Sequence, residues 1–362
     1  MQYAVVIYLL ATTVLSGLYL FDQFVRPEES PVAEQVVQGE ADTSLEKYAF
    51  DVLQQTVFEP SPFTIGEEIE EEEGYRTYRA VIHTPDGNVS GLVHVPAESN
   101  SPRPFILLLR GFVDRSIYQS GIGSSRVGQE LAKAGYVSFS PDFLGYGESD
   151  PPSDNPMEER FQGYTTTLQI LSSVKELSAA LQQVDELSVE VDAERVGIWG
   201  HSNGGHIALT TLTLTSKKYP TVLWAPVSKP FPYSILYYTD EYDDGGKALR
   251  KLIAQFEVTY DVSRYSTEQF YDSIAAPIQI HQGIDDDPVP VEWSEELYAD
   301  LNELEKDVDL FIYESSDHNL APKGWSQAVA RSISFYNRFL DKGDEPEDES
   351  QDEPSDESSL AL

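Results

Sequence analysis

A serine between two glycines, in Gly200-His201-Ser202-Asn203-Gly204, has the setting of a nucleophile. The apolar segment 195–200 before it is typical of a buried strand, and a helix is predicted from about Asn203. Flanking glycines allow the tight, strained turn that presents a serine side chain at the end of a strand. This pattern predicts a nucleophile elbow at Ser202, against the alternative of an ordinary glycine-rich turn. Asn203 would then offer its backbone N–H to an oxyanion.

A serine hydroxyl needs a base near neutral pH, and the order of residues along the chain selects one histidine. In folds with such an elbow the serine comes first, then the acid, then the histidine. Three of the six histidines precede the serine, one lies a turn along the helix after it, and one sits inside a strand: His83, His94, His201, His206 and His281. His318, in Ser316-Asp317-His318-Asn319 directly after the last predicted strand, is the predicted base.

The acid is expected after the strand that precedes the last one. There the chain reads Pro277–Gly283 and then Ile284, followed by Asp285, Asp286 and Asp287. One of these carboxylates should accept a hydrogen bond from the histidine, fix its tautomer and stabilise the imidazolium. Chemistry alone leaves the choice among the three open, and the other two could cap the following helix or stay solvated.

The elements around these residues predict a single fold class. Continuous apolar strands at 104–112, 136–143, 195–200 and 277–283 alternate with helical segments, which indicates a mostly parallel sheet with helices on both faces. A hairpin with an Asp86-Gly87 turn precedes them. This is the pattern of the α/β-hydrolase fold. Residues 229–272 break the alternation and are expected to form a small cap insertion.

Three motifs in this order, GHSNGG, HQGIDDDPVP and SDHN, resemble the catalytic domain of the prolyl oligopeptidase family. They are also similar to dienelactone-hydrolase-like esterases. The resemblance covers about Tyr75 to Leu340. It implies that the acid is Asp286, three residues after Gly283 and three before Val289. It also implies that a second oxyanion donor, the N–H of Phe112, follows the third main strand.

The residue before that loop departs from the family pattern. The family usually has His-Gly where this chain has Arg110-Gly111. Arg110 could bind an acidic group of the substrate, but an ion pair with a carboxylate such as Asp142 is the preferred interpretation.

The family resemblance implies serine-type peptidase activity on small peptides or hydrolysis of carboxylic esters. About 50 residues separate the N-terminal apolar segment from the catalytic domain, which is too few for the β-propeller that filters substrates in prolyl oligopeptidases. A different class stays open, namely a catalytically silent, membrane-tethered binding protein on the same fold.

The ends of the chain have a different composition. Residues 1–21 carry no charged side chain, which favours a transmembrane anchor over a cleaved signal peptide, with the catalytic domain outside the cytoplasm. We expect residues 22–74 to be a tether with a short helix and a solvated acidic run. Residues 75–340 would form the catalytic domain and 341–362 a disordered acidic tail.

Charge and composition also restrict the partners. The formal net charge is −38, so nucleic acid is not an expected partner. The chain has no cysteine, no phosphate loop and no ligand-spaced set of metal-binding residues. The sequence therefore predicts no metal and no cofactor. Its predicted partners are a small ester or short peptide, and a membrane through the N-terminal segment.

Overall fold

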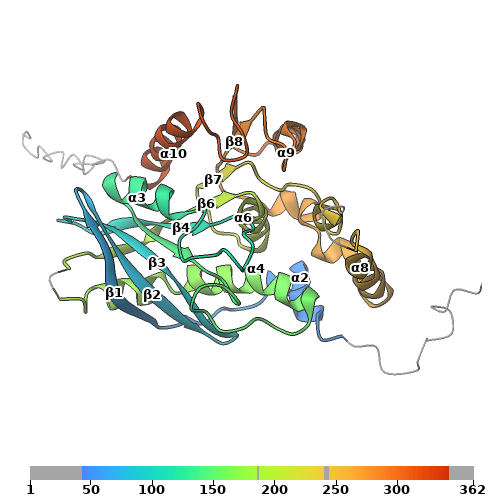
Figure 1. The fold of residues 1–362 in the computed structure, drawn as a ribbon, viewed down its shortest axis with the longest axis horizontal. Coiled ribbons are helices and arrows are strands. Elements are labelled where there is room, and N and C mark those ends of the chain that lie inside the picture. The colour runs from blue at the N-terminus through green and yellow to red at the C-terminus, as the bar shows by residue number, and fades with distance from the viewer. Residues whose placement is uncertain (1–42, 186, 240–243, 342–362) are drawn as a thin grey trace, which may run out of the picture. The chain divides into compact units, whose positions relative to one another are not determined.

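The computed structural model describes residues 43–185, 187–239 and 244–341. In this part of the chain a nine-stranded sheet has the order β1-β2-β3-β5-β4-β6-β7-β8-β9 (Figure 1). The first three strands are antiparallel, β3 pairs antiparallel with β5, and the six strands from β5 to β9 are parallel. The strands are β1 Phe63–Glu72, β2 Tyr75–Thr84, β3 Gly87–Pro96, β4 Arg103–Leu109, β5 Val137–Pro141, β6 Val191–His201, β7 Thr221–Trp224, β8 Ile278–Gly283 and β9 Val308–Tyr313.

Helices cover both faces of the parallel part, as predicted (Figure 1). Successive side chains of β4 alternate between two separate cores: Phe105 and Leu107 face one, while Ile106 and Leu108 face the other. The first core is covered by α4 Pro156–Ser172, α5 Val174–Leu181, α6 Asn203–Leu214 and α9 Val291–Glu303. The second lies under α3 Ser125–Lys133 and α10 Trp325–Leu340. Two buried faces explain why these strands are continuously apolar.

The predicted domain boundary at residue 75 is wrong. The compact unit begins at Ser44. A short 3-10 helix, η1 Glu46–Tyr48, and α2 Phe50–Leu53 bury their aromatic side chains in the first core. The acidic run is not part of a tether: it lies in β1, the edge strand paired with β2. Its glutamates face solvent as expected, and several pair with arginines of β2, which lets an edge strand carry so much charge.

The segment between β7 and β8 contains the predicted insertion. It holds α7 Tyr233–Leu236, α8 Lys247–Thr259 and two 3-10 helices, η3 Val262–Tyr265 and η4 Thr267–Ser273. Phe256 of α8 packs against Phe161 of α4 and Phe231, with ring centroids 5.9 and 5.5 Å away. Tyr260 and Tyr265 hydrogen-bond to the main chain of Leu45. Most of the insertion is thus anchored beside α4 and the N-terminal helices (Figure 1).

Several predictions concern residues outside the described part of the chain. The apolar segment 1–21, the start of the predicted tether, residues 240–243 of the insertion and the acidic tail after Asp341 all fall there. Within residues 43–185, 187–239 and 244–341, no helix combines the length and apolar character needed to cross a bilayer. The membrane anchor and the location outside the cytoplasm remain predictions from the sequence.

Candidate active site

The turn from β6 into α6 holds Ser202 in a strained backbone conformation. Its φ and ψ are 55° and −119°, a region that residues with a side chain rarely adopt. Neighbouring main chain maintains it, because Ser202 N donates to Trp224 O at 2.9 Å and Val227 N donates to Ser202 O at 3.0 Å. A Cβ on Gly204 would lie 1.9 Å from Leu109 O, so only glycine fits there. These features are the geometry expected of a nucleophile elbow.

Asp286 and His318 meet beyond the ends of β8 and β9. His318 Nδ1 lies 3.0 Å from Asp286 Oδ1 and 2.9 Å from Oδ2, with Nδ1–H the donor. The Asp286 side chain is fully buried, whereas Asp285 and Asp287 are exposed. Val289 N also donates to Asp286 Oδ1 at 2.8 Å. Of the three adjacent aspartates, only Asp286 is placed to orient this imidazole.

A direct contact brings the His318 loop to the elbow. His201, the residue before Ser202, donates from Nε2 to the main-chain oxygen of His318 at 2.9 Å. The two imidazole ring centroids are 4.6 Å apart. Burial lowers the pKa of His201 to about 4, so its ring is neutral near pH 7 and its single N–H is committed to this bond. The loop that carries the predicted base is therefore held against the residue that precedes the predicted nucleophile.

The loop after β4 lies against the same elbow. A Cβ added to Gly111 would approach Ser202 Cβ to 3.0 Å, so the Gly111-Phe112 peptide borders the serine. The Phe112 side chain is 76% exposed and its backbone N–H is free of hydrogen bonds to other described residues. Asn203 begins α6, where the first N–H groups of a helix have no partner within the helix. Both predicted oxyanion donors are thus available beside Ser202.

Arg110 makes different contacts from those expected. Its side chain is buried, at 4% exposure, which does not favour a direct contact with substrate. Nη2 donates to the main-chain oxygen of Asp142 at 2.8 Å, and no ion pair joins Arg110 to the Asp142 carboxylate among the described residues. Nη1 donates to Gly111 O at 2.9 Å. Arg110 therefore contacts Asp142 through its backbone oxygen and not through the predicted ion pair with the carboxylate.

Aromatic side chains border the site on the side of α7 and α9. Trp293 packs with Val227 and Val289, the two residues whose N–H groups support Ser202 and Asp286. Tyr237 lies 4.7 Å from Trp293 between ring centroids and is 39% exposed. This wall offers an apolar surface next to the predicted triad.

The model of the prolyl oligopeptidase family matches residues 129–343, more than half of the chain. The chain belongs to the prolyl oligopeptidase family. The resemblance predicted from its motifs is thereby confirmed, and the chain is a serine hydrolase. A relative from Bacillus subtilis strain 168, the uncharacterized peptidase YtmA, is 26% identical over 240 residues, which covers 65% of this chain and 83% of that protein.

Solved structures of the same fold include both esterases and peptidases. The acetyl xylan esterase from Paenibacillus sp. R4 is 18% identical with a TM-score of 0.53, and the match covers 82% of this chain and 95% of the esterase. The acylaminoacyl peptidase of Pyrococcus horikoshii is 16% identical with a TM-score of 0.52, and the match covers 81% of this chain and 44% of the peptidase. At these identities the likeness confirms the α/β-hydrolase fold and does not select a substrate.

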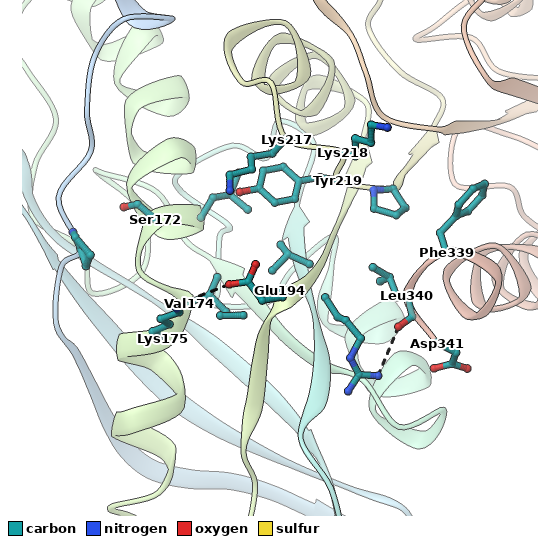
Figure 2. Close-up of a pocket in the computed structure, with 16 residues that line it drawn as sticks. Ser172, Val174, Lys175, Glu194, Lys217, Lys218, Tyr219, Phe339, Leu340 and Asp341 are labelled. Atoms are coloured by element: carbon teal, nitrogen blue, oxygen red, sulfur yellow. Dashed lines mark hydrogen bonds and ion pairs between the residues drawn. The ribbon is translucent and has the colours of Figure 1, made fainter. Parts of the chain in front are cut away.

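A large cavity in the present structure lies away from the predicted triad. It has a volume of about 600 Å³ and is bordered by the first half of β6, by residues 217–220 that precede β7, and by the end of α10 (Figure 2). Ser202 follows the opposite end of β6. Because β6 and β7 are parallel, both strands begin on one side of the sheet and both have their carboxyl ends on the opposite side. The cavity is therefore separate from the candidate active site.

Two residues of the site lie within the GHSNGG and HQGIDDDPVP motifs, but the sequence does not indicate what they contact. His201 holds the His318 loop through a hydrogen bond to the main-chain oxygen of His318, whereas the sequence indicates only a structural role for it. Gln282, the next-to-last residue of β8, donates from Nε2 to Asp286 Oδ2 at 2.8 Å and to Val289 O at 3.1 Å. Its Oε1 accepts from Ser294 Oγ at 2.7 Å. Both side chains act through contacts that form only once the strand ends come together.

Proposed function

We propose that the chain hydrolyses carboxylic esters or short peptides through a triad of Ser202, His318 and Asp286. The observation that carries this proposal is the bond from His201 Nε2 to His318 O, which brings the Asp286-oriented imidazole beside the residue that precedes Ser202. Membership of the prolyl oligopeptidase family supports the reaction class.

The chemistry follows from the positions of these groups. Ser202 Oγ attacks the carbonyl carbon of the substrate while His318 Nε2 takes its proton. Asp286 accepts from Nδ1–H throughout, and so it fixes the tautomer in which Nε2 is free to act as base. Backbone N–H groups of Phe112 and Asn203 donate to the oxyanion that develops on the substrate.

Collapse of this tetrahedral species completes the first half of the reaction. The bond to the alcohol or amine breaks, and the leaving group takes the proton from His318 Nε2. Water then gives a proton to the same nitrogen and attacks the acyl-enzyme. The bond from the acyl carbon to Ser202 Oγ breaks, Oγ takes the proton back from His318 Nε2, and the acid is released. The half-exposed ring of Tyr237 beside Trp293 supplies an apolar surface for a substrate side chain.

A fluorophosphonate probe tests the role of Ser202. We expect stoichiometric labelling of the wild-type protein, none of Ser202→Ala, and full labelling of Ser228→Ala. Ser228 is a suitable control because its hydroxyl donates to Trp293 O near the site but lies outside the elbow. Equal labelling of Ser202→Ala would overturn the proposal. Absence of labelling in the wild type would instead favour a silent binding protein.

The substrate class needs a separate measurement. Hydrolysis of p-nitrophenyl esters of increasing acyl length should be compared with release of p-nitroaniline from aminoacyl and dipeptidyl anilides. A kcat/KM at least a hundredfold higher for one series identifies that class. Both activities should vanish together in Ser202→Ala, since the mechanism uses one nucleophile for both.

A further inference from the structure

The guanidinium of Arg110 packs against two aromatic rings, Tyr118 and Tyr146, which meet edge to face with their centroids 5.1 Å apart. Its carbon lies 4.4 Å from the ring centroid of Tyr118 and 4.1 Å from that of Tyr146. Nη1 and Nη2 donate to the main-chain oxygens of Gly111 and Asp142. A buried cation thus directs its donors at two backbone oxygens, one of them on Gly111, which borders Ser202.

We propose that Arg110 is a positioning residue that aims the N–H of Phe112 at the oxyanion. The inference rests on the proposed function. In a planar trans peptide, the carbonyl of one residue and the N–H of the next point in opposite directions. Because Arg110 holds Gly111 O toward its guanidinium at 2.9 Å, the Phe112 N–H must point away from it. Fixing the carbonyl therefore fixes the oxyanion donor.

The groups around Arg110 leave the N–H groups of its guanidinium available to donate to backbone oxygens. The Asp142 carboxylate, itself fully buried, already accepts from the hydroxyls of Ser90 at 2.6 Å, Tyr118 at 2.7 Å and Ser120 at 2.7 Å. Burial, and after it the Asp142 charge, raise the pKa of Tyr118, which keeps its hydroxyl a donor. With the carboxylate so occupied, the guanidinium is free to bridge two carbonyls.

The geometry also explains why arginine is needed. A guanidinium is a planar fork that can donate to two carbonyls while it packs against aromatic rings, as Arg110 does against Tyr118 and Tyr146. A lysine ammonium keeps the charge but is a single point that lacks the fork and the planar face. Arg110→Lys should therefore loosen the Gly111-Phe112 peptide without removing the donor itself.

Steady-state kinetics and a transition-state analogue test the role. The assay would use the best substrate from the ester and anilide series described above. We expect Arg110→Lys to lower kcat roughly 10- to 100-fold with KM changed less than threefold. The loss should be smaller than the roughly 10²- to 10³-fold cost of removing one oxyanion donor, because the Phe112 N–H is misaligned and not removed. The affinity for phenylboronic acid, which forms a tetrahedral adduct with the serine, should fall by a similar factor. Arg115→Lys is the matched control, since Arg115 also stacks on Tyr146, at 5.0 Å, but is exposed.

A second variant keeps the test valid if Arg110→Lys does not fold. Tyr146→Leu removes one stacked ring and leaves the guanidinium in place, so a smaller fall in kcat and in boronate affinity is expected. An active wild type with Arg110→Lys within twofold of it in both measurements would refute the positioning role alone. Loss of stability to urea with unchanged boronate affinity would also refute it. Activity retained in Ser202→Ala would instead refute the proposed function.

Discussion

Replacing Asp286 with asparagine tests the triad at its most constrained member. The two carboxylate oxygens accept from His318 Nδ1–H, from Val289 N and from Gln282 Nε2, all at 2.8 to 3.0 Å. Asparagine keeps the shape but turns one acceptor into an NH₂ donor. Wherever that NH₂ points, it meets an existing donor. The imidazole can relieve the conflict by moving its proton to Nε2, and it then cannot accept the proton of Ser202.

The expected loss follows from this change of tautomer. A triad histidine held in the wrong tautomer costs roughly 10⁴-fold in kcat in a comparable site, and we expect about 10³- to 10⁴-fold here. That corresponds to about 4 to 5.5 kcal/mol of transition-state stabilisation. KM should change little, because Asp286 has no exposed surface with which to touch substrate.

Two adjacent aspartates provide matched controls. Asp285→Asn and Asp287→Asn make the same chemical change on exposed side chains, so their kcat should remain within twofold of wild type. Ester hydrolysis at pH 7 to 8 would be measured for all three variants, with unfolding in urea as a check on integrity. A folded Asp286→Asn that keeps more than a tenth of the activity would refute the reasoning, as would a comparable loss in either control.

Three further predictions concern the residues that support the site. Gln282→Leu leaves the hydroxyl of Ser294 and the oxygen of Val289 without a partner, so the free energy of unfolding in urea should fall by about 2 to 4 kcal/mol, and Ser294→Ala should cost less. His201→Phe keeps a ring but loses the donor to His318 O, and kcat should fall about tenfold with fluorophosphonate labelling slowed to match. Burial lowers the pKa of four histidines to about 3 or 4: His94, His201, His206 and His281. Between pH 7 and pH 5 they gain protons only on unfolding, so the free energy of unfolding should fall by about 2 kcal/mol for each. Unchanged urea midpoints over this pH range would contradict the prediction.

Local patterns in the sequence were sufficient for the elements that carry the site. The apolar strand, the two glycines and the helix around Ser202 predict the elbow because all its determinants are contiguous. The hairpin was equally local: its predicted turn at Asp86-Gly87 joins β2 and β3 as expected. The parallel arrangement of the remaining strands was predicted from their alternation with helices.

Features that depend on contacts between distant segments were not predictable in the same way. The acidic residues of β1 suggested a solvated tether, since its strand character comes from pairing with β2 and not from its own apolar pattern. Likewise, three adjacent aspartates are chemically equivalent until the fold buries one of them. Arg110 was matched to Asp142, yet only the structure shows that the three hydroxyls already bound to that carboxylate direct the guanidinium to backbone.

The segment that carries His318 shows how the fold limits the freedom of a catalytic loop. Asp285 N donates to Ser316 O at 3.0 Å, and Asp317 N donates to Ala321 O at 2.7 Å. A Cβ on Gly283 would lie 2.2 Å from Ser316 O, so the loop can approach β8 this closely only over a glycine. These contacts offset the entropic cost of ordering the His318 loop during folding, so that cost does not have to be met when substrate binds. In the proposed mechanism, an imidazole fixed in this way needs no reorganisation before it accepts the proton of Ser202, which favours efficient proton transfer.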